Sequence, residues 1–456
     1  MLAVSVFSIL SLLLVCGKVL RVNLSFLQRL YLPSSVIGGL VGLAAISVFR
    51  DKVPPEWVAC AQKFPGFLIN VIFATLFLGV ATPRFGTVVR IAFPQLCFGQ
   101  LLAWGQYVLG LGLAGFVLVP LFGVPPAFGN LLEIGFQGGH GTVGGMSESF
   151  RSFGWEDGID LGLTVATVGM IVGVVVGMAL VGWAYGRGYV KEVLSFDERP
   201  ELERRGIHPP DARPAAGRQT VCSDSIDSLA WHIAIVGLAV GIGYLLLLGL
   251  QHAEVALFPN ATRRLFTGFP LFPLCMIGGV LLQSAVTRCG GSLLVDHGQM
   301  QRLSGAALDF LVLSAVATIK LSVVAANWAP LLALCLCGTL LSLLLVVFLA
   351  PRLFREAWFE RAIAEFGQST GVTATGLLLL RTVDPESKTV AAASFGYKQL
   401  LHEPFMGGGL WTALALTLVY QFGWKPVWYF SVAMAAAWSV AAYLVIRANR
   451  RKAGHK

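Results

Sequence analysis

Two short stretches gather glycines and polar side chains inside an otherwise apolar chain. The first, GFQGGHGTVGG (135–145), holds a glutamine, a histidine and a threonine among six glycines. The second, EFGQSTGVTATG (365–376), holds a glutamine and several hydroxyl side chains. Glycine permits the positive φ angles that a broken helix needs. A break leaves backbone N–H groups unpaired at one end and C=O groups at the other, so both stretches favour ion binding over covalent chemistry.

The two kinds of backbone group suit different ions. N–H groups at the start of a helix attract carboxylates, whereas carbonyl and hydroxyl oxygens are ligands for a hard cation such as Na⁺. We therefore expect half of a substrate and ion site in each stretch and no catalytic residue. The expected site residues are Gln137, Gly138, Gly139, His140, Gly141, Thr142, Gly367, Gln368, Ser369, Thr370, Gly371, Thr373 and Thr375, of which Ser369, Thr370 and Thr373 would hold Na⁺.

A simpler interpretation is that the glycines only let helices pack closely. Gln137 and Thr142 beside them, together with the matching second stretch, favour a site instead. For His140 alone, capping of backbone groups and contact with substrate are equally good interpretations. Its protonation would be a route to proton coupling.

Other polar residues are weaker candidates. Three roles are open for the three glutamates that flank the stretches: cation ligands, helix N-terminal charges and loop residues, of which we take the last as the default. Ionisable or amide side chains within or near apolar segments are costly to bury and hence of interest, although some lie near segment ends, where long side chains can reach the interface. The weaker candidates are Glu133, Glu148, Glu365, Arg84, Lys320, Asn70, Lys398, His402 and Glu403.

The composition decides the class of protein that holds these stretches. Of 456 residues, 56% are hydrophobic and 12% are charged, about half the charged fraction of soluble domains. The chain is therefore expected to be an all-α polytopic membrane protein. Its net charge of +9 lies mostly in short loops, as membrane topology requires, and indicates no nucleic-acid partner. The eight cysteines show no ligand spacing, so we expect no metal centre, and no cofactor beyond a coupling Na⁺.

A helix needs about 20 apolar residues to cross the hydrocarbon core. The apolar segments predict five spans, a polar linker at 187–228, and six further spans. The last span and a basic tail form an extra segment at 423–456. The predicted spans are 2–19, 32–49, 64–82, 92–120, 158–186, 229–250, 269–287, 306–325, 329–350, 391–422 and 427–446.

Lys and Arg concentrate on one side of this arrangement if the N-terminus is outside and the C-terminus is cytoplasmic. The linker, the loop at 351–361 and the tail RANRRKAGHK all fall on that side. The loop at 50–63, with Arg50, Lys52 and Lys63, runs against this assignment.

The two halves of the chain share short matches in the same order. LPSSVIGGL (32–40) matches FPLCMIGGV (272–280), and LGVATPRF (78–85) matches SAVATIKL (314–321). At an offset of 231 residues, Gln137 aligns with Gln368 and Thr142 with Thr373. Because each half has five spans, the second copy would enter the membrane from the other side. We therefore expect inverted repeats at 1–186 and 229–422, with re-entrant segments at 131–150 and 363–381.

GGHGT (138–142), the P-x-x-x-I-G-G start of the second span and the two halves around a polar linker resemble the bacterial sodium/glutamate symporter family over roughly residues 1–425. GQSTGVTATG (367–376) resembles the second re-entrant segment in one branch of that family, although it has fewer glycines than the best-known members. The resemblance implies a multi-pass protein of the bacterial inner membrane that couples Na⁺ entry to glutamate uptake by alternating access.

Three alternatives to this function remain. One is a symporter of another small carboxylate, and a second is a proton-coupled transporter of the same fold. An anion channel is the alternative of a different class, but its loops would line a pore bounded by charged or carbonyl rings. An enzyme is not expected, because the sequence has no nucleophile with its base. A homodimer is compatible with transport, and the partners are then glutamate, Na⁺ and the lipid bilayer.

Overall fold

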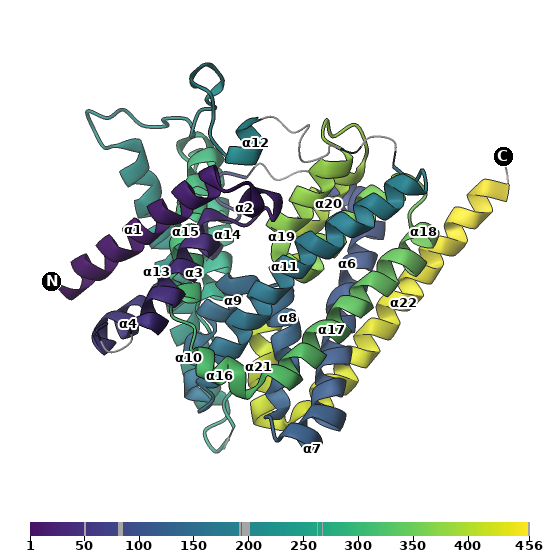
Figure 1. Cartoon of the computed structure of the whole chain (residues 1–456), viewed down its shortest axis with the longest axis horizontal. Helices are drawn as coiled ribbons and strands as arrows, with labels where there is room; N and C mark the ends of the chain where they lie inside the picture. The colour runs from purple at the N-terminus through teal and green to yellow at the C-terminus, as the bar shows by residue number, and fades with distance from the viewer. Residues whose placement is uncertain are drawn as a thin grey trace. The chain divides into compact units, whose positions relative to one another are not determined.

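The computed structural model describes residues 1–49, 52–80, 85–190, 193, 201–261, 263–266 and 268–454 (Figure 1). Within these ranges the chain forms helices and connecting turns, with no β-strand. Eight helices in the described part are long and apolar enough to cross a membrane. The expected class, an all-α polytopic membrane protein, is therefore confirmed. The eight are Leu2–Asn23, Pro55–Thr75, Ile91–Phe122, Asp157–Gly186, Ser228–Leu257, His297–Ala317, Trp328–Leu353 and Trp424–Arg451.

The other three predicted spans correspond to shorter helices. Helices α3 (Ser34–Val48) and α14 (Phe272–Arg288) have 15 and 17 residues. The single span predicted at 391–422 is wrong. It consists of α20 (Ala391–His402) and α21 (Leu410–Phe422), separated by residues 403–409, which include three consecutive glycines. Glycine is a poor helix former, which accounts for the interruption.

The chain divides into two compact units, each built from both halves of the sequence. Unit 1 comprises Met1–Thr82, His140–Ile159 and Pro200–Ile319. Besides α3 and α14, it contains α1 (Leu2–Asn23), α2 (Ser25–Arg29), α4 (Pro55–Ala61), α5 (Phe64–Thr75), most of α9 (Gly139–Gly145), α10 (Ser147–Ser152), α12 (Glu201–Arg205), η3 (Pro210–Ala212), α13 (Ser228–Leu257), η4 (Ser292–Leu294) and α15 (His297–Ala317).

Helices α3 and α14 occupy matching places in unit 1. Helix α3 packs between α1 and α15, and α14 packs between α13 and α5. The closest approaches use the glycine pair that the two sequences share. A Cβ at Gly38 would lie 2.7 Å from Leu313 Cδ1, and a Cβ at Gly278 would lie 3.0 Å from Gly243 N. The shared P-x-x-x-I-G-G pattern thus serves close helix packing in both halves.

Residues 201–228 of the linker belong to unit 1, where hydrogen bonds hold them. Lys18 Nζ donates to Gly206 O at 2.6 Å, which ties the linker to α1. The backbone N–H of Arg218 donates to Asp296 Oδ2 at 3.1 Å, and Thr220 Oγ1 donates to Leu294 O at 2.9 Å. The linker is therefore held near Gly206 and near Arg218, although its polar composition alone is typical of a flexible, solvated segment.

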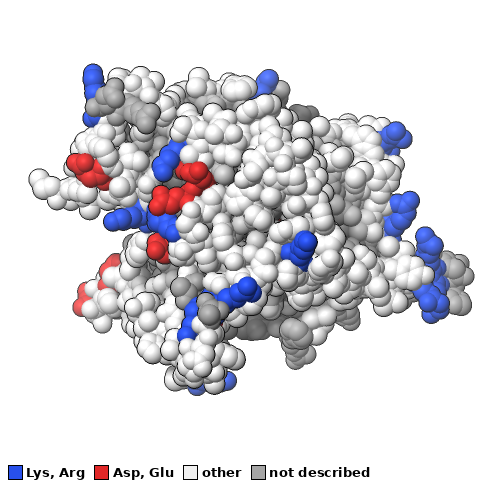
Figure 2. Space-filling view, turned by 90° about the horizontal axis from the view of Figure 1, so that it is seen from below, with Lys and Arg blue, Asp and Glu red and all other residues white. Residues whose placement is uncertain are grey.

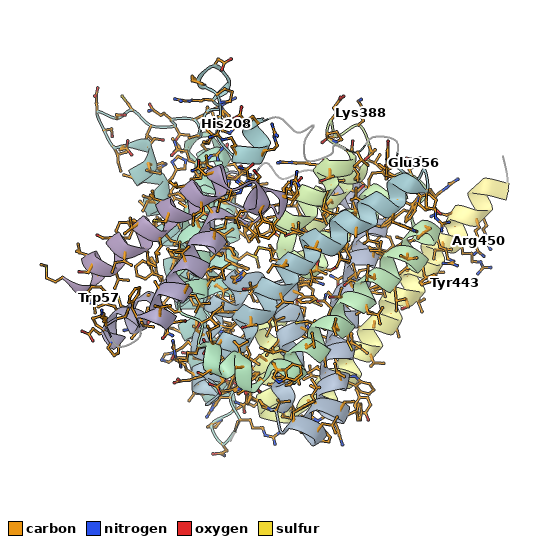
Figure 3. The ribbon with its side chains drawn as sticks, viewed as in Figure 1. Trp57, His208, Glu356, Lys388, Tyr443 and Arg450 are labelled. Carbon is orange, nitrogen blue, oxygen red and sulfur yellow. The ribbon has the colours of Figure 1, made fainter. Side chains whose placement is uncertain are left out.

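Unit 2 comprises Pro83–Gly139, Asp160–Arg199 and Lys320–Lys456. In it, α22 packs along α6, and Tyr443 and Arg450 lie on α22 (Figure 3). Besides α20 and α21, unit 2 contains α6 (Phe85–Leu113), η1 (Ala114–Leu118), α7 (Val119–Phe122), η2 (Pro126–Asn130), α8 (Leu131–Phe136), most of α11 (Asp157–Gly186), α16 (Leu321–Ala326), α17 (Trp328–Leu344), η5 (Leu345–Leu349), α18 (Ala350–Leu353), α19 (Trp358–Val383) and α22 (Trp424–Gly454).

Two π-helical turns in unit 2 repeat at the offset found in the sequence. The π-turn η1 continues into the four-residue helix α7, which carries Pro120 at its second position. The π-turn η5 continues into the four-residue helix α18, which carries Pro351 at its second position. Both pairs are related by the 231 residues that align Gln137 with Gln368. Since π-turns are rare, their recurrence is a second, independent sign of internal repetition.

Large apolar side chains cover much of the surface. Exposed examples include Phe7 on α1, Leu245 on α13 and Leu336 on α17. On the face seen in Figure 2, charged side chains are few and scattered among uncharged ones. Apolar surface of this extent is suited to contact with lipid.

Candidate functional site

Both glycine-rich stretches contain a break in a helix. In the first, α8 ends at Phe136, and α9 begins at Gly139, whose φ is +67°. In the second, α19 is interrupted at Gly371 (φ −143°) and Val372 (φ +65°). A positive φ is a genuine outlier for a β-branched residue. The expectation of broken helices is therefore confirmed for both stretches.

The two breaks touch each other within unit 2. The Cγ1 atom of Val372 lies where a Cβ on Gly139 would have to go. A glycine is thus required at 139 by both its φ angle and its neighbour. Through this contact, residues 137–139 of the first stretch lie against the second stretch.

Gln137 is oriented by a chain of hydrogen bonds. Trp104 Nε1 donates to Gln100 Oε1 at 2.9 Å, so the amide nitrogen of Gln100 faces His402 Nδ1 at 3.2 Å. Nδ1 is then the acceptor, and the proton resides on Nε2, which donates to Gln137 Oε1 at 3.1 Å. The hydrogen-bond network thus assigns the tautomer of His402. It leaves the amide nitrogen of Gln137 without an acceptor among the described residues.

Gln368 is oriented in the same way as Gln137, but its partner is a lysine instead of a histidine. Its Oε1 accepts from Lys398 Nζ at 2.7 Å, and its amide nitrogen has no acceptor in the part of the chain that the structure describes. Lys398 and His402 lie one turn apart on α20. The two glutamines that the sequence repeat aligns are therefore both held through their oxygen atoms, with exposed fractions of 4% and 3%.

Lys398 is enclosed by oxygen atoms. Its Nζ donates to Glu365 Oε2 at 3.0 Å and to Gln399 Oε1 at 3.1 Å, besides Gln368. Glu365 also accepts from Gln95 Nε2 at 2.9 Å. The side chains of the ion pair are 0% and 2% exposed. Buried charges of this kind persist only when they are paired and hydrogen-bonded.

Thr373 is bonded to α20 from the other side of the break in α19. Its hydroxyl donates to Glu403 Oε1 at 2.9 Å and accepts from Gln399 Nε2 at 2.7 Å. Gln399 Nε2 also donates to Glu403 Oε1 at 3.0 Å. Helix α20 therefore holds both sides of the break, through Gln368 before it and Thr373 after it.

The other expected hydroxyl ligands make local bonds. Ser369 Oγ and Thr370 Oγ1 both donate to Phe366 O, at 3.1 and 2.7 Å. Thr375 Oγ1 donates to Gly371 O across the break. Each hydroxyl oxygen keeps lone-pair capacity, because donation uses only its hydrogen. The hydroxyls are thus compatible with a cation but do not enclose one by themselves.

The glycines have distinct positions. The N–H of Gly138 donates to Glu133 O at 3.1 Å, and Gly367 packs against Gly376 within α19. Gly371 forms the break itself. His140, Gly141 and Thr142 belong to unit 1, where they lie in α9; the His140 and Thr142 side chains are 7% and 1% exposed.

Glu133 fixes the loop that separates α20 from α21. Its carboxylate accepts from Tyr107 Oη at 2.7 Å, from the Gly407 N–H at 2.8 Å and from Thr412 Oγ1 at 3.0 Å. Glu133 is completely buried. The interpretation of Glu133 and Glu365 as loop residues is therefore wrong, because both are buried acceptors inside helices. It is also wrong for Glu148, which is exposed, lies 3.6 Å from Arg151 and stands in the first turn of helix α10, where it is a helix N-terminal charge.

The remaining weaker candidates make no described contact with the two helix breaks. Arg84 lies outside the described residues. Lys320 is exposed, and its backbone N–H donates to Asp160 Oδ1. Asn70 Nδ2 donates to Gly66 O within its own helix. Arg361, assigned by sequence to a charged loop, is instead buried in α19, where its Nε donates to Gln95 Oε1 at 2.8 Å.

Comparison with known proteins places this arrangement in a family. The family model described as sodium/glutamate symporter matches residues 1–377, which include both broken stretches. This chain belongs to the sodium/glutamate symporter family. It is 24% identical over 379 residues to the sodium/glutamate symporter of Escherichia coli (strain K12), and equally so to that of Shigella flexneri. Each match covers 82% of this chain and 86% of the relative.

Membership of this symporter family makes the chain a membrane transporter rather than an enzyme. The matched region ends within α19, so Lys398, His402 and Glu403 lie beyond it. Sequence reasoning also missed the amides and aromatic side chains of α6 that orient the site. Their only signal was the presence of polar residues in an apolar segment: Gln95, Gln100, Trp104, Gln106 and Tyr107.

Proposed function

We propose that the protein is a Na⁺-coupled symporter that takes glutamate into the cell. The observation that carries the proposal is the pair of oriented glutamines. Gln137 and Gln368 each have their oxygen atom engaged by a basic side chain, and among the residues that the structure describes their amide nitrogens have no acceptor. An amide N–H donor oriented in this way is suited to a carboxylate. Glutamate has two carboxylates, and the site offers two such donors.

The coupling ion is proposed to bind beside the breaks. Ser369, Thr370 and Thr373 offer hydroxyl oxygens, and the interrupted backbone of α19 offers carbonyl oxygens. These are ligands for a hard cation. A bound Na⁺ would offset the negative charge of the substrate, which gives a physical reason for coupling the two. The N–H groups at the start of a helix after a break would assist the carboxylates.

Transport is proposed to follow alternating access around two re-entrant segments, 131–150 and 363–381, in inverted repeats at 1–186 and 229–422. The repeated π-turns with their following prolines support the repeat, as do the matching places of α3 and α14. Helix α22 and the tail would be an addition to the repeats. We further propose the bacterial inner membrane, an external N-terminus, a cytoplasmic C-terminus and a homodimer.

The test is uptake of labelled glutamate by the purified protein in liposomes. An inward Na⁺ gradient is compared with a K⁺ gradient and a pH gradient, and competition is measured with other amino acids and dicarboxylates. Accumulation that requires Na⁺ and saturates supports the proposal. Uptake driven by the pH gradient alone would assign proton coupling, and unsaturable flux would indicate a channel. Competition by a different carboxylate, without glutamate uptake, would reassign the substrate.

A further inference from the structure

The oxygen cage around Lys398 lies next to the proposed ion site but is occupied by the protein itself. It consists of one carboxylate oxygen, from Glu365, and two amide oxygens, from Gln368 and Gln399, at 2.7 to 3.1 Å from Nζ. A donor set made only of carboxylate and carbonyl-type oxygens is the kind that hard cations select. Here the cation is an ammonium group.

Lys398 is not available to bind substrate. An ammonium group has three N–H donors, and its three contacts use all of them. The side chain is also completely buried. Its charge therefore acts on Glu365 and the two amides rather than on a carboxylate that enters the site.

The orientation of the cage does not depend on Lys398 alone. Gln399 Nε2 is bound to Thr373 Oγ1 and Glu403 Oε1, so its oxygen must face the cage. Glu365 is held by Gln95 Nε2 on its other oxygen. Removal of the ammonium would thus leave an ordered, negatively charged set of oxygens. The nearby charged groups are Glu403, bonded to Gln399, and Arg361, bonded to Gln95.

We propose that the Lys398 ammonium is a built-in cation, which fills a position in this cage that Na⁺ would otherwise take and so lowers by one the number of sodium ions that the protein binds. The cage touches α19 before the break through Gln368 and is linked beyond it through Gln399 to Thr373. A fixed cation there stabilises the broken helix in the absence of the coupling ion. The effect of Lys398 on the number of transported sodium ions rests on the proposed Na⁺-coupled function. The presence of a cation site at Lys398 does not rest on it.

The test compares Lys398→Ala with wild type in two measurements. The first is the thermal unfolding midpoint of the purified protein as choline chloride is replaced by NaCl at constant ionic strength. A ligand that binds the folded state stabilises it in a concentration-dependent way. We expect the midpoint of Lys398→Ala to rise more steeply with Na⁺ than wild type, by the equivalent of one additional ion. The second is the Na⁺ dependence of uptake, in which the Hill coefficient should rise by one.

Two further variants serve as controls. Lys398→Ala combined with Glu365→Gln removes the carboxylate from the cage and should return the Na⁺ dependence of unfolding to that of wild type. Lys388→Ala removes an exposed lysine paired with Glu386 at 2.8 Å and should change neither measurement. If Lys398→Ala is not recovered as folded protein, Lys398→Asn replaces it, because its short side chain also leaves room for an ion.

The inference would be overturned if the unfolding midpoint of Lys398→Ala rose with Na⁺ no more steeply than that of wild type. It would also be overturned if the midpoint of the double variant rose as steeply as that of Lys398→Ala. The two proposals fail separately. Wild type that shows no Na⁺-driven glutamate uptake, with a steeper unfolding slope in Lys398→Ala, would reject the proposed substrate and keep the built-in cation. Na⁺-driven glutamate uptake by wild type, with the same unfolding slope in Lys398→Ala as in wild type, would keep the proposed function and reject the built-in cation.

Discussion

Gly139 and Val372 both have positive φ angles, +67° and +65°, and lie in contact at the breaks of two helices far apart in the sequence. A β-branched residue in this conformation is strained by about 1–3 kcal/mol. Strain of this kind persists only where the surroundings impose it. The pairing therefore holds the two stretches in one arrangement and sets the positions of Gln137 and Gln368 beside it.

Replacement of Gly139 tests this contact. Gly139→Ala should abolish or greatly reduce transport, since its Cβ would overlap Val372 Cγ1 and its φ would be unfavourable. Val372→Gly should restore part of the activity in the double variant, because it removes the overlap. Initial uptake rates of the single and double variants measure the coupling. The control is Gly182→Ala, at a helical position with open space around it; a similar loss there would refute a specific effect.

The oriented amides predict a loss of substrate affinity. Gln137→Ala and Gln368→Ala should each raise the KM for glutamate about 10- to 100-fold, because a hydrogen bond to a charged group is worth about 1.5–3 kcal/mol. Uptake kinetics at saturating Na⁺ measure the change. Gln301→Ala is a matched control, since that amide also pairs with a histidine, His297, at 3.1 Å but is exposed and lies in unit 1. An unchanged KM in both site variants would contradict the proposed roles.

Glu133 predicts a stability effect independent of transport. Glu133→Gln should lower the free energy of unfolding by about 2 kcal/mol, because an amide nitrogen would replace an oxygen that faces N–H or O–H donors. Chemical denaturation in detergent measures this loss. Glu148→Gln, at an exposed site, should stay within about 0.5 kcal/mol of wild type. Equal stability of the two variants would show that the Glu133 bonds to Tyr107 and Gly407 contribute little.

The linker contact at Asp296 predicts altered proteolysis. Asp296→Ala removes the acceptor of Arg218 N and Gln299 N, a loss of about 1–2 kcal/mol. Tryptic cleavage after Arg218 should become about 5- to 30-fold faster if it follows local opening. Asp211→Ala, in the exposed turn η3, is the control and should leave the rate unchanged.

The same contact has a defined pH dependence. Burial raises the pKa of Asp296, but the hydrogen bonds from the Arg218 and Gln299 backbone, together with the charges of His232 and Arg218, outweigh it, so the pKa lies below its usual value. The stabilisation is therefore complete above about pH 4 and is lost only as the pH falls through the folded-state pKa. Hydrogen exchange of the Arg218 amide should show no protection change between pH 7 and pH 5, and a change in that range would contradict the ionised contact.

The sequence by itself determined the class of the protein, most of its apolar helices, the two helix breaks and their repeat at an offset of 231 residues. These features depend on local composition and spacing: a long apolar segment has few alternatives to a membrane helix, and clustered glycines weaken a helix wherever they occur. The family resemblance was argued from short local motifs, and the family model matches residues 1–377.

Only the tertiary structure decided which polar groups meet. His402 bonds Gln137 from 265 residues away, Gln95 bonds Glu365 from 270, and Arg361 lies in a helix rather than a loop. The charge of a residue is visible in the sequence, but its partner is not, because a hydrogen bond between distant segments depends on how whole helices pack. For that reason the sequence indicated a candidate site, and the fold alone determined how Gln137, Gln368 and Lys398 are oriented.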